Sequence, residues 1–373
     1  MERPRMRIGI LTSSRADYGY YKPLLGAFQE NHSIDLKIIA FGTHLSEKHG
    51  LSKNQIIKDG FNIHHELNTF LNEDLPENIA FSFAESNKLF AEFWKKNQFE
   101  FDWILALGDR YEMAAAVISS IPFQLNIAHF YAGETTEGAI DDIYRNQITL
   151  VCKKHFVSLP IYKKRVQELI GKEGDVEVIG NLSLHNLIDF EFLSVEEFYN
   201  LWNIDLNKPT ILITFHPETV NYNANFKYSN TVFDALTYLS RFYQLVITMP
   251  NADTNASIYR TVFENLRKKH KNVYLIENFG TKSYFTCMKF SKCILGNSSS
   301  GIVEAASFGR YAVNVGDRQK GRFAPENVLH VPFDSNLICR AVESVSDKSF
   351  NKENQFFFRA DAIELIINSF VQK

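Results

Sequence analysis

Two short apolar runs separated by a helical pattern constrain the fold of this chain more than any other feature. The runs cover Trp103–Leu107 and residues 125–130, and each has the length and continuity of a strand that is buried on both faces. Residues 110–120 between them are rich in alanine, have helical spacing and end just before Pro122. This order predicts a β-α-β unit with two parallel strands in one sheet.

Charged side chains gather directly behind both strands. Ligands of open parallel sheets bind beyond the carboxyl ends of the strands, so we expect these side chains at a ligand site. From the residues alone two structural roles also stay open, a helix N-cap at Asp109 and an i,i+4 salt bridge between Asp141 and Arg145. The charged residues in question are Asp109, Arg110, Glu134, Asp141, Asp142 and Arg145.

Length and composition exclude several classes of protein. A chain of 373 residues suits two domains, and the net charge of −3 gives no basic surface for nucleic acid. No run of about 18 apolar residues is present and the chain starts with polar residues, so we expect neither a membrane span nor a secretory signal. Four scattered cysteines without CxxC spacing are typical of buried thiols in a reducing cytoplasm. No ligand cluster has metal-site spacing, and we expect no metal or cofactor.

Strands and helices alternate through the chain twice, with a break at Asn207-Lys208-Pro209. We therefore predict an α/β fold of two Rossmann-like domains, residues 1–180 and 181–353, with a last helical pattern at 354–373. The other strands are predicted at residues 7–11, 34–41, 155–158, 176–180, 210–215, 245–249, 273–276, 293–295 and 311–315. The main helices are predicted at residues 20–31, 79–97, 141–152, 160–170 and 193–202.

The loop after the first strand, residues 12–19, contains Arg15 and Asp17. A strand, a polar loop and a helix form a plausible phosphate contact, because helix N-termini present free N–H donors. A polar loop without any ligand explains these residues equally well. In the polar segment 42–58, His44 and His49 could face a cleft, but histidines are more common at the surface and we expect them there.

Three strand ends of the second half carry polar residues, namely His216, Asn251 and the run 296–304. In that run, small residues let the backbone approach a diphosphate, and Ser298 and Ser299 can hydrogen-bond its oxygens. Glu304 is placed to accept hydrogen bonds from ribose hydroxyls. The alternative is a set of helix caps, since serine and asparagine are favoured there.

A cationic loop follows the last predicted strand of the second half. Residues 316–322 contain Arg318, Lys320 and Arg322. An exposed loop with this composition is ordinary. Beside the serine run, at the same edge of the sheet, these cations would instead complement a diphosphate.

Several uncommon strings occur in a fixed order along nearly the whole chain. They are residues 14–18 (SRADY), 108–110 (GDR), 132–134 (AGE), 138–142 (GAIDD), 216–217 (HP), 296–299 (GNSS) and 326–328 (ENV). By these strings the chain resembles the UDP-N-acetylglucosamine 2-epimerases, in particular the hydrolysing branch of sialic-acid-type sugar biosynthesis.

The resemblance implies an architecture and an assembly. The family has the glycosyltransferase-B arrangement, with two Rossmann-like domains around a cleft and the last helix packing back on the first domain. It also implies a homodimer and a UDP-sugar as substrate. The residues that it places against the nucleotide are Arg15, Asp17, His216, Asn251, Ser298, Ser299, Glu304 and Arg318.

The resemblance also implies a reaction. Hydrolysing members remove the C2 proton, expel UDP from C1 to leave a glycal, and add water to give the free 2-epimeric N-acetyl sugar. Carboxylates in a closed cleft suit the proton transfers. The residues that the resemblance makes catalytic are Asp109, Glu134, Asp141 and Asp142, with Arg110 and Arg145 supporting the charge.

The chain departs from the family pattern at three positions. Tyr131 stands where many relatives have an acid, Ala132 replaces the first glycine of Gly-Gly-Glu, and Asn146 replaces a histidine. Tyr131 could donate a proton or shape the sugar pocket. The departures leave room for another sugar, such as the 2,4-diacetamido-6-deoxy sugar of legionaminic-acid pathways, and for another nucleotide. Other functions considered are a non-hydrolysing epimerase, a glycosyltransferase of the same architecture and a non-catalytic nucleotide-sugar sensor.

Overall fold

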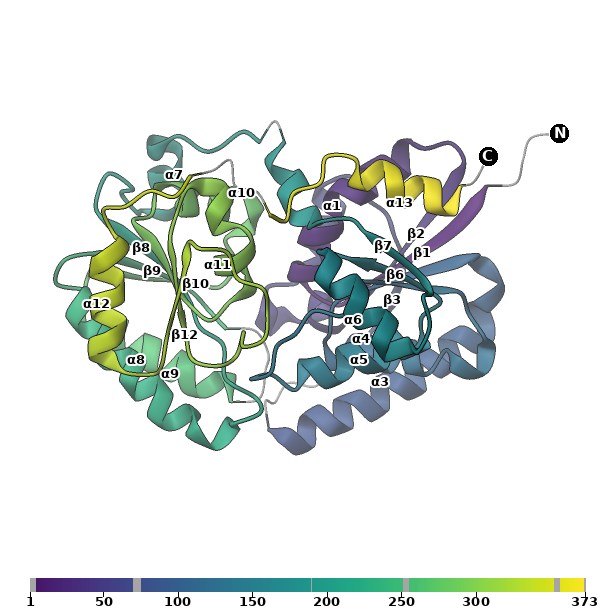
Figure 1. The fold of residues 1–373 in the computed structure, drawn as a ribbon, viewed down its shortest axis with the longest axis horizontal. Helices are drawn as coiled ribbons and strands as arrows, with labels where there is room; N and C mark the ends of the chain where they lie inside the picture. The colour runs from purple at the N-terminus through teal and green to yellow at the C-terminus, as the bar shows by residue number, and fades with distance from the viewer. Residues whose placement is uncertain (1–4, 70–74, 189, 251–254, 352–355, 372–373) are drawn as a thin grey trace. The chain divides into compact units, whose positions relative to one another are not determined.

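The chain packs as two compact α/β units. In the computed structural model, the described residues are 5–69, 75–188, 190–250, 255–351 and 356–371. Unit 1 comprises residues 1–134, 141–188 and 357–373, and unit 2 comprises residues 135–140 and 189–356. Each unit has one parallel sheet with helices between the strands, so the predicted α/β fold class with two Rossmann-like halves is confirmed (Figure 1).

Unit 1 is built on a seven-stranded parallel sheet in the order β3-β2-β1-β4-β5-β6-β7. The order reverses between β1 and β4, which is the point where open parallel sheets bind their ligands. The strands are β1 (Met6–Thr12), β2 (Ile34–Phe41), β3 (Ile63–Leu67), β4 (Trp103–Leu107), β5 (Ile127–Phe130), β6 (Lys154–Val157) and β7 (Asp175–Val178).

Helices cover both faces of this sheet. Successive residues of β1 point to opposite faces, so Ile8 and Ile10 join one core and Leu11 joins the other. The first core includes α1 and α13, which lie side by side in Figure 1, and the second includes α3, α4 and α5. The helices are α1 (Arg15–Glu30), α2 (Lys53–Lys58), α3 (Pro76–Asn97), α4 (Tyr111–Ile118), α5 (Asp141–Val151), α6 (Pro160–Ile170) and α13 (Ala362–Phe370).

Unit 2 contains a six-stranded parallel sheet in the order β10-β9-β8-β11-β12-β13, which reverses between β8 and β11. One core joins this sheet to α8, α9 and α12. The strands are β8 (Thr210–Thr214), β9 (Gln244–Thr248), β10 (Val273–Ile276), β11 (Cys293–Gly296), β12 (Ala312–Val315) and β13 (Val328–Val331). The helices are α7 (Val195–Trp202), α8 (Asn225–Leu239), α9 (Ala256–Lys269), α10 (Gly280–Phe290), α11 (Ser299–Val303) and α12 (Ser335–Val345).

Two edge strands, β3 and β13, are absent from the sequence predictions. Both lie at an edge of their sheet and carry histidine among apolar residues, His64 and His65 in β3 and His330 in β13. An edge strand is only partly buried, so its sequence lacks the continuous apolar run that marks a central strand.

Helix α1 begins earlier than its apolar spacing indicates. The spacing predicts a start at residue 20, whereas the helix starts at Arg15 with Ser14 as its N-cap. Ser14 and Asp17 form a capping box, in which each side chain bonds to the other's backbone N–H. This local bonding fixes the first turn without any apolar periodicity.

The surface position expected for His44 is wrong. His44 is buried, its Nε2 lies 2.8 Å from Thr12 Oγ1 and its Nδ1 lies 2.8 Å from Ser52 Oγ. Burial lowers the pKa of His44 to about 3, so the ring is neutral at pH 7. The neutral ring bridges the end of β1 and the segment before α2.

In the part of the chain that the structure describes, no helix is both long and apolar enough to cross a membrane.

Helix α13 should contribute strongly to the stability of unit 1, because Ile366 and Phe370 are buried in the same core as α1. We predict that Ile366→Ala lowers the free energy of unfolding by about 2–5 kcal/mol, as large-to-small core substitutions do. The exposed Glu364→Ala in the same helix should change it by less than about 0.5 kcal/mol. Urea denaturation measures both; equal effects would show that α13 adds no core packing.

Candidate active site

A buried guanidinium organises the candidate catalytic residues of unit 1. Arg145 in α5 is 1% exposed. Its Nη1 donates to the Glu134 carbonyl oxygen at 2.7 Å and to Asp142 Oδ1 at 3.0 Å, and its Nη2 is paired with Asp109. Four of the six residues predicted to be catalytic therefore meet beyond the ends of β4 and β5.

These contacts bear on the structural alternatives for the same residues. The N-cap of α4 is Arg110 and not Asp109, so the N-cap role considered for Asp109 is wrong. Arg145 forms an ion pair with Asp142, three residues before it, and a second with Asp109. Arg165 Nη2 also lies 3.3 Å from Asp142 Oδ2. The ion pairs of this cluster therefore join several segments and not only residues of one helix. Asp141 is the first residue of α5, next to Asp142.

Two glycines shape the backbone that carries the acids. Gly108 and Gly133 have φ angles of +87° and +74°, a region that glycine adopts without strain. A Cβ on Gly133 would lie 2.7 Å from the Tyr162 carbonyl oxygen, so α6 can approach only a glycine here. The next residue, Glu134, is buried, and its Oε1 accepts a 2.7 Å hydrogen bond from Ser158 Oγ.

Arg110 is held by an acid that the sequence analysis did not select. Its Nε and Nη2 donate to Glu112 Oε2 at 3.2 Å and to Oε1 at 3.1 Å, and the Glu112 side chain is fully buried. A two-point contact of this kind fixes the guanidinium plane as well as its position. The signal in the sequence was an acid in the first turn of the helix that follows Arg110.

His129 is hydrogen-bonded to the backbone next to Asp109. Its Nε2 lies 2.8 Å from the Gly108 carbonyl oxygen and its Nδ1 lies 3.1 Å from Thr149 Oγ1. Burial lowers the pKa of His129 to about 3, which keeps the ring neutral. A carbonyl oxygen can only accept, so the proton is on Nε2 and His129 fixes the residue before Asp109.

Tyr131 belongs to the core of unit 1. It has a φ angle of +63°, which is uncommon for a residue other than glycine, and it is buried. Its hydroxyl oxygen accepts a 2.9 Å hydrogen bond from the Leu182 N–H, and its ring meets Tyr20 edge to face. This geometry ties the end of β5 to the short helix η5 (Leu182–Leu187).

Asp17 stabilises the loop between β1 and α1. Its carboxylate accepts hydrogen bonds from the backbone N–H and hydroxyl of Ser13, at 2.8 and 2.7 Å, and from those of Ser14, at 3.1 and 2.9 Å. Burial raises the pKa of Asp17, while these hydrogen bonds oppose that shift. Arg15 is half-buried in the first turn of α1, directly behind this loop.

In unit 2, Asn297 joins the ends of three neighbouring strands. Its side-chain oxygen accepts from the His216 N–H at 2.7 Å and its amide nitrogen donates to the His216 carbonyl at 2.8 Å. Its own carbonyl oxygen accepts from Gln319 Nε2 at 3.0 Å and from Arg318 Nη1 at 3.3 Å. The loops with His216, Ser298 and Arg318, which follow β8, β11 and β12, therefore meet at one edge of the sheet.

Gly296 permits this junction. A Cβ at Gly296 would lie 1.8 Å from the Thr214 carbonyl oxygen, and its φ angle is +145°. Only glycine lets the end of β11 approach β8 this closely.

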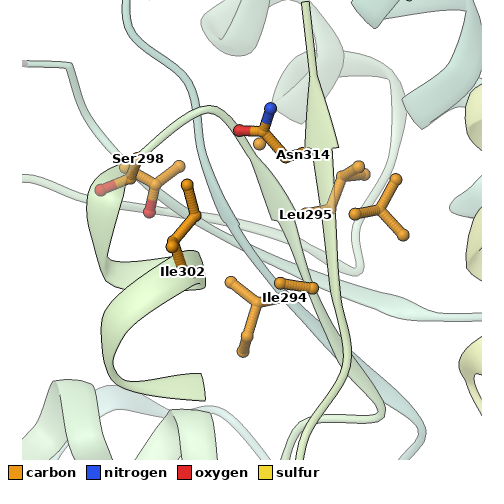
Figure 2. A pocket seen from close by; sticks show the side chains of 10 residues that line it. Ile294, Leu295, Ser298, Ile302 and Asn314 are labelled. Atoms are coloured by element: carbon orange, nitrogen blue, oxygen red, sulfur yellow. The ribbon is translucent and has the colours of Figure 1, made fainter. Parts of the chain in front are cut away.

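The serine run begins a helix of five residues, α11. Ser298 is its N-cap and accepts from the Ser300 N–H at 3.4 Å, so the capping role considered for this run applies to Ser298. Ser299 is the first residue of α11, and Glu304 is buried at its end. Figure 2 shows Ser298 and Asn314 with Ile294, Leu295 and Ile302 around a small pocket beside β11.

Glu218 fixes the cationic loop that contains Arg318, and the sequence analysis did not select it. It is buried, its Oε1 accepts from the Asp317 N–H at 2.6 Å, and burial raises its pKa. A Cβ on Gly316, with φ +78°, would lie 2.5 Å from the same oxygen. The predicted nucleotide contact Asn251 lies outside the described residues.

Among the described residues, no three side chains of His, Cys, Asp or Glu gather in a way that could hold a metal ion.

Asn297 should be important for the stability of unit 2. We predict that Asn297→Ala lowers the free energy of unfolding by about 2–5 kcal/mol, because it leaves the buried N–H and C=O groups of His216 without partners. Asn221→Ala, which removes an exposed hydrogen bond to Tyr228, is the control and should change it by less than about 0.5 kcal/mol. Denaturant titration compares them, and equal stability would contradict the role of Asn297.

Comparison with known proteins identifies the family. Residues 26–371 match the family described as UDP-N-acetylglucosamine 2-epimerase. A Campylobacter jejuni protein named GDP/UDP-N,N'-diacetylbacillosamine 2-epimerase (hydrolyzing) is 32% identical, over 93% of this chain and 89% of the relative. An Escherichia coli protein named polysialic acid biosynthesis protein P7 is 30% identical, over 92% and 87%.

A solved structure agrees with these sequence matches at the level of the fold. The Methanocaldococcus jannaschii UDP-GlcNAc 2-epimerase, in complex with UDP-GlcNAc and UDP, has a TM-score of 0.80 at 17% identity, covering 98% of this chain and 99% of that one. The chain therefore belongs to the UDP-N-acetylglucosamine 2-epimerase family and is an enzyme of its hydrolysing type.

Proposed function

We propose that the enzyme converts a UDP-linked 2-acetamido sugar and water into UDP and the free 2-epimeric sugar. A base removes the C2 proton, the C2–H electron pair forms a C1–C2 double bond, and the C1–O bond breaks as UDP leaves. Water then adds its oxygen to C1. A proton adds to C2 on the face opposite the one from which the first proton was removed. The observation that carries the proposal is the convergence of the Asp109 and Asp142 carboxylates and the Glu134 carbonyl oxygen on the buried Arg145.

The two steps need an acid, a base and positive charge, and the cluster offers each of them. Asp109 and Asp142 are 27% and 19% exposed, so substrate can reach both carboxylates. We assign proton transfer to the acids Asp109, Glu134, Asp141 and Asp142. Arg145 orients the acids, and Arg110, fixed by Glu112, supports the negative charge that develops on the leaving group.

The nucleotide contacts are proposed at the strand ends of both units. In unit 2, the support is the junction at Asn297, which gathers the loops with His216, Ser298, Ser299 and Arg318 at one edge. Backbone N–H groups, hydroxyls and a guanidinium suit a diphosphate, and Glu304 suits a ribose. Arg15 and Asn251 complete the proposed set, while Asp17 acts by holding the loop before Arg15.

The sugar is proposed as N-acetylglucosamine or 2,4-diacetamido-2,4,6-trideoxyglucose, linked to UDP. The name of the Campylobacter jejuni relative supports the second, and the name of the Escherichia coli relative supports a place in the synthesis of sialic-acid-type sugars. The buried hydroxyl of Tyr131, bonded to the Leu182 N–H, supports a role in shaping the site rather than in proton transfer.

NMR of the purified enzyme with each UDP-sugar in D2O tests the reaction. Free 2-epimeric sugar with deuterium at C2, together with UDP, is the expected result. Epimerised sugar still linked to UDP would indicate the non-hydrolysing reaction. A product that forms only with an added acceptor would indicate a glycosyltransferase, and UDP binding without turnover of either sugar would indicate a sensor.

We also propose that two copies of the chain pair and that the protein works in the cytoplasm. Two large apolar side chains of α5, Ile143 and Leu150, are exposed and lie seven residues apart on one face, which supports an interface there. Four free, buried cysteines support a reducing compartment. Light scattering should give twice the chain mass of 43.0 kDa.

Asp109 should be essential for turnover and dispensable for nucleotide binding. We predict that Asp109→Asn folds, binds UDP with an affinity within about threefold of wild type and loses at least about a hundredfold in kcat, because one proton-transfer group is gone. Steady-state kinetics and calorimetry measure these values. Near-normal kcat would remove Asp109 from the catalytic set.

The serine run should contribute to UDP affinity. We predict that Ser298→Ala with Ser299→Ala weakens UDP binding at least about tenfold, because two hydroxyl contacts to the diphosphate are lost. Ser194→Ala is the matched control, since Ser194 caps α7 in the same unit. Calorimetry with UDP compares them, and unchanged affinity in the double variant would exclude a phosphate contact by these hydroxyls.

A further inference from the structure

The six residues Thr135–Ile140 join two proposed catalytic acids and pack in the other unit. Glu134 precedes this segment and Asp141 follows it, and both acids belong to unit 1. The segment itself belongs to unit 2. We call Thr135–Ile140 the strap.

The loop behind β8 holds one side of the strap. The Ile140 N–H donates to Thr219 Oγ1 at 2.8 Å, one residue before Asp141. In return the Thr219 N–H donates to the Gly138 carbonyl oxygen at 3.2 Å. Thr219 therefore binds the strap through its hydroxyl and its backbone, three residues beyond the proposed nucleotide contact His216.

The cationic loop behind β12 holds the other side. The Glu137 N–H donates to the Lys320 carbonyl oxygen at 3.0 Å. A Cβ on Gly138 would lie 2.4 Å from the Asp317 carbonyl oxygen and 2.6 Å from Arg318 Cα. Contacts this short are tolerated only because residue 138 has no side chain. The strap thus lies directly on the backbone of Arg318.

The two holding loops are themselves connected. Glu218, next to Thr219, accepts a 2.6 Å hydrogen bond from the N–H of Asp317, next to Arg318. A displacement of the Arg318 loop therefore acts on the strap directly through Gly138 and indirectly through Glu218 and Thr219. The strap is short, and a segment of six residues spans at most about 20 Å. Glu134 and Asp141 are only four and three residues from Gly138, so a shift of the strap is transmitted over a short length of chain.

We propose that Thr219 and Gly138 are positioning residues, which make the placement of Glu134 and Asp141 depend on the loops that contain His216 and Arg318. This inference rests on the proposed function, in which those loops bind the diphosphate and those acids transfer protons. Its consequence is that the acids are correctly placed for elimination only when the loops that bind the leaving group are in place. The strap thereby couples nucleotide binding to proton transfer.

Thr219→Val tests the proposal, because valine has the shape of threonine and lacks the acceptor for Ile140 N–H. We expect kcat to fall at least about tenfold, while KM for the UDP-sugar and Kd for UDP change by less than about twofold. Thr219→Ser keeps the hydroxyl and should restore most of kcat. Thr231→Val, at a position of α8 where the hydroxyl bonds only within the helix, controls for the substitution. Unchanged kcat in folded Thr219→Val would overturn the proposal.

Hydrogen exchange of the strap amides provides a readout that does not need turnover. In wild-type enzyme, UDP should slow exchange at the Glu137 and Ile140 amides, and Thr219→Val should speed exchange at Ile140. If no UDP-sugar reacts but these exchange effects appear, the proposed reaction fails and the coupling stands. If turnover is normal but UDP leaves exchange of the strap unchanged, the coupling fails and the reaction stands.

Gly138→Ala is a second test of the coupling, for the case that Thr219→Val does not fold. Its Cβ must push the strap away from Asp317 and Arg318, so kcat should again fall at least about tenfold with UDP affinity retained. A Gly138→Ala enzyme with normal kcat would overturn the proposal.

Discussion

The structure of the candidate catalytic centre depends on how Arg145 is buried. Moving an unpaired guanidinium out of water costs several kcal/mol, so a side chain that is 1% exposed requires charged or polar partners. Asp109 from the end of β4, Asp142 from α5 and the Glu134 carbonyl from the end of β5 supply them. The carboxylates in turn need the cation, since like charges at this spacing repel. Arg145 therefore lets the carboxylates of Asp109 and Asp142, from two segments, share one site.

In unit 2, the neutral side chain of Asn297 satisfies buried polar groups of the backbone. The Asn297 amide both donates and accepts, so it satisfies the N–H and the C=O of His216 without introducing charge. The Arg318 guanidinium donates to the Asn297 carbonyl oxygen, which is a neutral acceptor. A carboxylate at position 297 would place a negative charge at the proposed diphosphate site. The difference fits the proposed roles, in which unit 1 transfers protons and unit 2 attracts the diphosphate.

The central strands could be predicted from the sequence because a strand buried on both faces must be apolar throughout. Residues such as those of β4 and β8 have no solvent-facing side, and their continuous apolar runs mark them. Because these runs are apolar throughout, the polar residues directly after them mark the strand ends, and Asp109, Glu134 and Ser298 were selected in this way. The surface position expected for His44 was wrong because its hydroxyl partners, Thr12 and Ser52, lie 32 and 8 residues away in the sequence, and nothing next to His44 signals those bonds.

Contacts between distant segments could not be predicted, and Gly138 shows why. Sequence rules assign meaning to glycine mainly through turns and positive φ angles, which is the conformation of Gly108 and Gly133. Gly138 has no positive φ; it is required because the backbone of Asp317, far away in the sequence, occupies the space of its Cβ. The same holds for Thr219, whose partner Ile140 is 79 residues away. A residue that is required by contact with a segment distant in the sequence has no local sequence pattern. Its role can be recognised only in the three-dimensional structure.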